Sequence, residues 1–138
     1  MNDIQPSFIG VHLTVADVKA SVDFYRLIGL SLPELSEFDE HVEIDLGRGR
    51  HLALSNERIA RRYDPAWRAP SGQTASALQF QVDSREAVDH LYKKVIAAGY
   101  HAHLAPVDAF WGNLYAEVDD PDGNIVGFHS PTDPGTRS

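Results

Sequence analysis

An internal repeat limits the folds that this chain can adopt: two segments about 67 residues apart follow the same plan. In each segment apolar and polar residues alternate, as in a half-buried strand, and an amphipathic helical pattern follows at once. The matching pairs at this offset are Val15/Val82, Ala20/Ala87, Phe24/Leu91, Tyr25/Tyr92 and Arg26/Lys93. The sequence therefore predicts a duplicated supersecondary unit.

The first copy begins with a strand over 8–15 and continues with a helix over 18–28. Asp17 is placed to cap the first amides of this helix, and Gly29 is placed to close it. The second copy has a strand around 77–82, a capping-box spacing at Asp83–Glu86, and a helix that ends at Gly99. Further short β-like runs follow at about 30–35, 41–46, 50–55, 100–104, 113–118 and 124–130.

Each copy thus reads as strand, helix and three strands, which predicts one α+β domain built from two βαβββ modules. Module 1 covers about 8–55 and module 2 about 75–131, with a linker at 56–74 and a tail at 132–138. A lone four-stranded unit leaves one sheet face open and an edge unpaired. We therefore expect the modules to form a curved mixed sheet around a cleft. The residues expected to face that cleft are Gly10, His12, Thr14, Ala77, Gln79 and Gln81.

Composition excludes several classes of function. The chain has no cysteine, so disulfides, thiolate metal sites and a cysteine nucleophile are excluded. A net charge of -8 disfavours nucleic acids and anionic membranes. The basic cluster at Arg58, Arg61, Arg62 and Arg68 reads as a solvated loop. No apolar run is long enough for a membrane span, and the first residues lack a signal-peptide layout, so we expect a cytoplasmic protein.

The segment Asp120-Pro121-Asp122-Gly123 has the composition of a tight turn. Pro121 fixes φ at the first corner, Asp120 can accept hydrogen bonds from the turn amides, and Gly123 tolerates a positive φ. Apolar residues on either side predict a β-hairpin.

These motifs together carry a resemblance to a known family. Leu13–Asp17 leads into Ser21–Tyr25, and Trp111-Gly112 precedes Asp120–Asn124. This pattern, in paired βαβββ modules, resembles the vicinal oxygen chelate superfamily, which includes glyoxalase I, extradiol dioxygenases, fosfomycin-resistance transferases and bleomycin-resistance proteins. The likeness covers about 8–131 and is closest in character to the metal-free bleomycin-resistance type. It implies a homodimer.

The resemblance also implies where a metal would bind. The family's ligand positions fall on Gly10, about Ala53, Ala77 and Gly127, and none of these side chains donates to a metal. We therefore expect no metal at the usual place and no cofactor. The alternative is a site shifted by two residues, formed by His12, His51 and His129, which would suit zinc, nickel or iron.

We expect the ligand-binding residues to be polar cleft residues and large aromatic side chains. They are His12, Thr14, His51, Gln79, Gln81, Phe110, Trp111, Tyr115, Glu117 and His129. Phe110 and Trp111 offer flat surface for an aromatic or planar ligand. Trp67 in the linker adds similar surface. His101 and His103 read as solvent-facing residues without a carboxylate partner.

Three hypotheses on the function remain open, and no catalytic residue is assigned. The leading hypothesis is a metal-independent protein that binds a small, aromatic or planar, neutral or cationic molecule, with drug or toxin sequestration and antibiotic resistance as one use. The alternative is a lyase, isomerase or dioxygenase that uses the shifted three-histidine site, or a catalyst with His12 or His129 as general base. A third reading is a protein-interaction module with a vestigial cleft.

Overall fold

The computed structural model describes residues 4–35, 39–72 and 75–133, so the end of the predicted tail lies outside the described residues. The chain divides into two compact units, Met1–Pro70 (unit 1) and Ser71–Ser138 (unit 2). Unit 1 contains β1 (Gly10–Val15), α1 (Val18–Leu27), β2 (His41–Gly47), β3 (Arg50–Asn56) and α2 (Glu57–Tyr63). Unit 2 contains β4 (Ala77–Gln81), α3 (Arg85–Ala97), β5 (Ala102–Asp108), β6 (Leu114–Asp119) and β7 (Ile125–His129).

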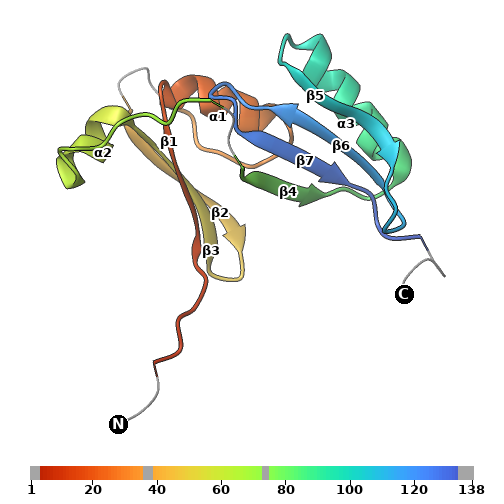
Figure 1. Ribbon diagram of the computed structural model, residues 1–138, viewed down its shortest axis with the longest axis horizontal. Coiled ribbons are helices and arrows are strands. Elements are labelled where there is room, and N and C mark those ends of the chain that lie inside the picture. Colours follow the sequence, from red (N-terminus) through yellow and green to blue (C-terminus); the bar gives the residue numbers. More distant parts are fainter. Residues whose placement is uncertain (1–3, 36–38, 73–74, 134–138) are drawn as a thin grey trace. The chain divides into compact units, whose positions relative to one another are not determined.

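The strands of unit 1 form a three-stranded sheet in the order β1-β3-β2 (Figure 1). β1 runs parallel to β3, and β2 runs antiparallel to it. The apolar face of this sheet is buried together with α1. Its core residues are Val15, Val18, Val22, Phe24, Tyr25, Val42, Ile44, Leu52 and Leu54. The other face of the sheet carries the polar residues that form the site described below.

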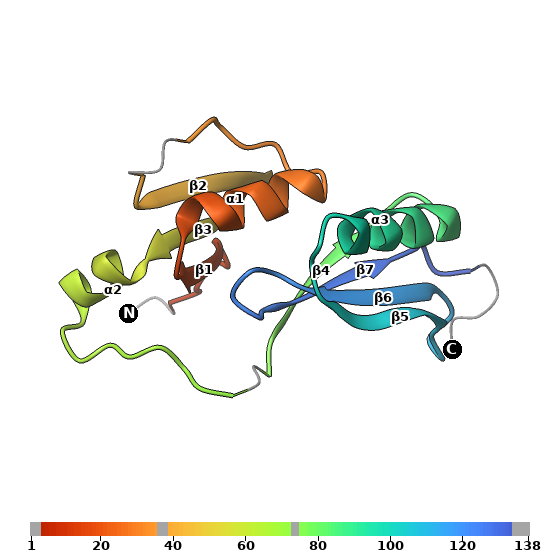
Figure 2. The same ribbon diagram turned by 90° about the horizontal axis from the view of Figure 1, so that it is seen from above.

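Unit 2 repeats this plan with one more strand, in the order β4-β7-β6-β5. β4 pairs with β7 in parallel, and the other pairs are antiparallel. α3 covers one face of the sheet (Figure 2). The side chains buried there are Val88, Val95, Ala116, Val118, Val126 and Phe128. The internal repeat is confirmed by equivalent elements in the two units. β1 and β4 are each followed by a helix, and each pairs in parallel with a later strand of its own unit.

The predicted fold class is therefore confirmed: the protein is α+β, and its described residues form two mixed sheets and three helices. The cleft between the modules remains a prediction. Within the described residues, no helix is long and apolar enough to cross a membrane.

The N-cap residue of α1 is the predicted one, whereas the N-cap residue of α3 is not. The Asp17 carboxylate accepts a hydrogen bond from the Ala20 amide at 3.2 Å, as expected for an N-cap. Gly29 has a φ of 112°, and it lies where the chain leaves α1. At α3, however, the cap is Ser84, whose hydroxyl accepts from the Ala87 amide at 3.1 Å. The capping box predicted for Asp83 is wrong by one residue, because Ser84 is the last extended residue before the helix.

The turn between β6 and β7 forms as predicted. The buried Asp120 carboxylate accepts hydrogen bonds from the amides of Asp122 and Asn124, each at 2.9 Å. The Gly123 amide donates to the Asp120 carbonyl at 3.0 Å, and Gly123 has a φ of 84°. This turn fixes the register of the hairpin that carries several site residues.

Two predicted segments differ in the structure. Residues 30–35 form no strand: the guanidinium of Arg26 donates to the carbonyl of Pro33 at 2.6 Å, and Pro33 lacks an amide for strand pairing. The predicted linker 56–74 contains α2, whose first turn is capped by the Asn56 side chain, which accepts from the Ile59 amide at 3.1 Å. Arg58, Arg61 and Arg62 therefore lie on a helix rather than a loop, although all three are exposed.

Candidate functional site

The polar face of the unit 1 sheet is set by strand register. β1 pairs Gly10 with His51, His12 with Ala53 and Thr14 with Ser55. β2 pairs His41 with Ser55 and Glu43 with Ala53. Paired residues in adjacent strands point to the same face. β2 also pairs Asp45 with His51, so the residues on this face are Gly10, His12, Thr14, His41, Glu43, Asp45, His51, Ala53 and Ser55.

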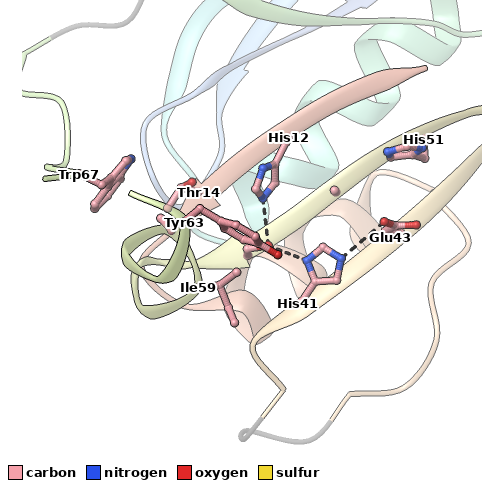
Figure 3. A pocket seen from close by; sticks show the side chains of 11 residues that line it. His12, Thr14, His41, Glu43, His51, Ile59, Tyr63 and Trp67 are labelled. Carbon is pink, nitrogen blue, oxygen red and sulfur yellow. Dashed lines mark hydrogen bonds and ion pairs between the residues drawn. The ribbon is translucent and has the colours of Figure 1, made fainter. Parts of the chain in front are cut away.

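A pocket with a volume of about 540 Å³ lies on this face, and we call it the unit 1 pocket (Figure 3). Its floor consists of His12, Thr14, His41, Glu43, His51, Ala53 and Ser55. Its wall comes from α2 and the chain after it, through Ile59, Ala60, Tyr63 and Trp67. One side of the pocket is thus largely apolar and aromatic, and the other is polar. This division is typical of small-molecule sites.

Trp67 is held in the pocket wall by two contacts. Its backbone amide donates to the Asp64 carbonyl at 2.9 Å. The guanidinium carbon of Arg61 lies 5.4 Å from the centre of its ring, within the range of a cation–π contact. Trp67 is half-buried, so part of its surface remains free for a ligand.

A hydrogen-bonded chain runs across the pocket floor. The hydroxyl oxygen of Ser55 lies 2.9 Å from Nε2 of His12 and 2.6 Å from Nδ1 of His41. Nε2 of His41 lies 3.6 Å from Oε1 of Glu43. Ser55 is fully buried, whereas both imidazoles are exposed. The sequence analysis omitted His41, although the alternation of β2 with Glu43 would have placed it on this face.

Unit 2 brings four of the predicted ligand residues together on one sheet face, and we call them the unit 2 cluster: Gln79, Tyr115, Glu117 and His129. The Tyr115 hydroxyl donates to Glu117, and the Gln79 amide donates to the Tyr115 hydroxyl at 3.4 Å. His129 is hydrogen-bonded to Gln79 through Nε2. Gln81 pairs with His129 in the register of β4 and β7, so it lies on the same face.

The surroundings of the unit 2 cluster shift the pKa values of Tyr115 and His129. Burial, followed by the hydrogen bond to Glu117, raises the pKa of Tyr115 to about 12. Burial lowers the pKa of His129 from its usual value, and the negative charge of Glu117 partly opposes that change. Tyr115 is thus a hydrogen-bond donor at neutral pH, and His129 is favoured in its neutral form.

Phe110 and Trp111 extend this cluster into an aromatic group. The ring of Trp111 lies 4.9 Å from that of Phe110 and 5.7 Å from that of Tyr115, between centroids. The Trp111 indole donates to Asn113 at 2.7 Å. Phe110 is 95% exposed and Trp111 is 42% exposed. Unit 2 therefore presents aromatic surface of the kind that the sequence analysis predicted.

His101 and His103 have carboxylate partners, contrary to prediction. Nδ1 of His101 lies 2.7 Å from Asp119, and Nδ1 of His103 lies 3.2 Å from the same carboxylate. Nε2 of His103 lies 3.9 Å from Glu117. The partners were missed because they belong to β6, which pairs with β5 across a shifted register. Asp108 at the end of β5 is paired with Arg85.

The four positions where the family places metal ligands do not fit a metal. Ala53 and Ala77 have no donor atoms. A Cβ on Gly10 would lie 1.9 Å from the carbonyl oxygen of His51, so backbone already fills that space. A Cβ on Gly127 would lie 2.8 Å from the Tyr115 hydroxyl. Among the described residues, no group of three or more His, Asp or Glu side chains could hold a metal ion.

The predicted shifted site divides between the units. His12 and His51 lie on the same face of unit 1 and both line the unit 1 pocket. His129 belongs to unit 2, where it contacts Gln79 and Asn113. The three-histidine site therefore remains a prediction.

Comparison with known proteins defines the family. The model of the Glyoxalase/Bleomycin resistance protein/Dioxygenase superfamily matches residues 8–128. The chain therefore belongs to the glyoxalase/bleomycin resistance protein/dioxygenase superfamily. No curated protein matches this sequence.

Solved structures share the fold. A glyoxalase/bleomycin resistance protein/dioxygenase family enzyme from Burkholderia phytofirmans PsJN is 25% identical, with a TM-score of 0.76 over 88% of this chain and 95% of that one. A glyoxalase-related enzyme from Fulvimarina pelagi is 23% identical, with a TM-score of 0.76 over 91% and 88%. Lactoylglutathione lyase from Agrobacterium tumefaciens is 21% identical, with a TM-score of 0.67 over 94% and 96%.

Proposed function

We propose that this protein is a small-molecule-binding member of the superfamily that needs no metal at the family's usual position. The ligand is neutral or cationic and has a flat apolar part. It lies in the unit 1 pocket, with its flat part against Trp67 and its polar part toward the histidines of the floor. The binding surface predicted between the two modules, including Phe110 and Trp111, remains a prediction.

The observation that carries this proposal is the division of the unit 1 pocket into an aromatic wall and a polar floor. Its volume of about 540 Å³ falls within the range of about 300–1,000 Å³ typical of ligand pockets. Glu43 is the one Asp, Glu, Lys or Arg among its lining residues. Together with the net charge of -8, this carboxylate favours a neutral or cationic ligand over an anionic one.

The metal-independent part of the proposal is supported by the four family positions. Ala53 and Ala77 have no donor atoms in their side chains. At Gly10 and Gly127 there is no side chain, and an added one would collide with neighbouring atoms. Binding without metal chemistry is sufficient for drug or toxin sequestration, and hence for antibiotic resistance, in a cytoplasmic homodimer. These uses rest on the resemblance to bleomycin-resistance proteins.

A ligand panel tests the proposal. Fused-ring aromatic compounds are compared as an amidine, an amide and a carboxylate of the same ring, by calorimetry and by the shift in melting temperature. We expect the amidine and the amide to bind and the carboxylate to bind at least tenfold more weakly. Preference for the carboxylate, or no binding by any compound across the ring series, would contradict the proposal.

The two tryptophans of the chain supply a matched pair of variants. Trp67→Ala removes the indole ring from the wall of the unit 1 pocket, whereas Trp111→Ala removes an indole ring from the aromatic group of unit 2. We expect Trp67→Ala to weaken binding by tenfold or more and Trp111→Ala to leave it within a factor of two. The reverse result would move the binding site to the aromatic group of unit 2.

The alternative function is an enzyme with a histidine general base or with the shifted metal site, and the chain of His12, Ser55 and His41 supports the general base. Metal analysis of untagged protein purified without chelators tests the metal-dependent form of this alternative. A stoichiometric transition metal that is lost in His12→Ala would replace the binding proposal with the enzyme.

A further inference from the structure

Three of the polar side chains on the floor of the unit 1 pocket, those of His12, Ser55 and His41, form an arrangement that lies outside the family's metal-ligand positions. The buried hydroxyl of Ser55 lies between two exposed imidazoles and is within hydrogen-bond distance of a nitrogen of each (Figure 3). A serine with no accessible surface is unsuited to attack a ligand itself. Its position instead couples the two histidines.

The coupling follows from the number of protons. A hydroxyl has one proton to donate and lone pairs that accept. When the hydroxyl donates to one of the two nitrogens that face it, the other nitrogen donates to its oxygen. A neutral imidazole carries its proton on one nitrogen, so in these arrangements one of the outer nitrogens, Nδ1 of His12 and Nε2 of His41, presents an N–H group and the other a lone pair. If both inner nitrogens donate to the Ser55 oxygen instead, both outer nitrogens present a lone pair.

The negative charge of Glu43 favours one of these proton arrangements. Its carboxylate oxygen lies 3.6 Å from Nε2 of His41, and a negative charge there favours a proton on that nitrogen. Nδ1 of His41 then accepts the proton of Ser55. The Ser55 oxygen in turn accepts the N–H of His12 Nε2, so Nδ1 of His12 is left with a lone pair. In the described part of the chain, the hydrogen bond of His12 runs through Nε2 to Ser55, and none is found at Nδ1.

We infer that Nδ1 of His12 is a fixed hydrogen-bond acceptor of the pocket, and that it selects ligands with an N–H or O–H group beside a flat ring. Ser55, His41 and Glu43 are positioning residues that hold His12 in the Nε2–H tautomer. This inference rests on the proposed function for the ligand, but the tautomer itself is a property of the free protein.

Nitrogen-15 NMR of the free protein tests the inference without a ligand. Long-range proton–nitrogen correlations, at an alkaline pH where free imidazole is neutral, identify the protonated nitrogen of each ring. We expect both His12 and His41 as Nε2–H tautomers. Both rings in the Nδ1–H form, or His12 alone in that form, would overturn the inference. His41 alone in the Nδ1–H form would overturn the role assigned to Glu43 and His41.

Two variants test the cause. Glu43→Gln removes the charge, so we expect a measurable population of the Nδ1–H tautomer at both His12 and His41. Ser55→Ala removes the link, so we expect the tautomer of His12 to become independent of residue 43. His51 lines the same pocket without a contact to Ser55 and serves as the internal control. An unchanged His12 spectrum in both variants would overturn the assigned role of these residues.

A pair of probes tests selectivity. 2-Naphthol carries an O–H donor, and 2-methoxynaphthalene has the same ring without it. We expect 2-naphthol to bind about tenfold more tightly to the wild type, and this preference to be lost in His12→Ala. Equal affinities for the wild type would overturn the selectivity. If the tautomers are as expected and neither probe binds, the proposed function fails while the inferred state of His12 stands.

Discussion

At the scale of single residues, the structure shows that the two glycines at family ligand positions are not simply missing side chains. The Gly10 Cβ direction points into the carbonyl of His51, and the Gly127 direction points into the ring of Tyr115. The space that a ligand side chain would need is occupied by backbone in unit 1 and by a phenol in unit 2. A metal-binding side chain at Gly10 or Gly127 would therefore require the surrounding atoms to be repacked, and a single substitution would not be sufficient.

Gly127→Ala tests this packing. The added methyl group would lie within 3 Å of Tyr115, which is buried, so we expect a loss of about 1–3 kcal/mol in the free energy of unfolding. Urea denaturation measures the loss. In a Tyr115→Ala background the same substitution has free space, and its effect is expected to fall below about 0.5 kcal/mol. Equal losses in both backgrounds would contradict the proposed collision.

The titration of Tyr115 gives a second prediction at this scale. Its pKa of about 12 lies above the ordinary 10.0, so the unfolded chain releases the proton at lower pH than the folded one. The associated stabilisation is present below pH 10.0 and is lost as the pH rises through about 12. The tyrosine ionisation that near-ultraviolet absorbance detects in the wild type but not in Tyr115→Phe should occur near pH 12, and at lower pH in Glu117→Gln. A difference between the wild type and Tyr115→Phe with its midpoint near pH 10.0 would refute the assignment.

At the scale of elements, α2 is the part of unit 1 that the repeat does not contain. It follows β3 directly, and it buries Ala60 while placing Ile59 and Tyr63 on the pocket wall. Without α2 and the chain after it, the unit 1 pocket would lack its apolar and aromatic wall. The pocket therefore depends on an element that lies in the segment predicted as a linker.

The start of α3 provides a prediction for a helix end. Ser84→Ala removes the hydroxyl that accepts the Ala87 amide, so we expect a loss of about 0.5–2 kcal/mol in unfolding free energy. Asp83→Ala is the control and should change the stability by less than about 0.5 kcal/mol. Thermal or urea denaturation compares them. A larger loss in Asp83→Ala would restore the capping box that the sequence pattern indicated.

At the scale of the whole molecule, the chain is two copies of one supersecondary unit that have diverged. β1-β3-β2 of unit 1 corresponds to β4-β7-β6 of unit 2, and β5 has no counterpart strand in the described part of unit 1. The two units also present different chemistry on their sheets. Unit 1 has three histidines and a serine, whereas unit 2 has a buried phenol with glutamate and glutamine partners.

Removal of metal gives a prediction for the intact protein. Because the family positions in both units lack donors, we expect dialysis against EDTA to leave the melting temperature unchanged within about 1 °C. Added zinc, nickel or iron should not raise it at stoichiometric concentration. A melting temperature that falls on chelation and recovers with one of these ions would contradict a metal-independent protein.

The elements whose signals are local could be predicted from the sequence. Alternation in β1 and β4, the Asp17 cap and the Asp120 turn depend on residues a few positions apart, and the duplication made their order readable. The family resemblance also followed from these motifs. The site depended on more distant relations. His41 and Ser55 are 14 residues apart and His12 and Ser55 are 43 apart. Only strand pairing brings them together, because register is set by the packing of the whole sheet.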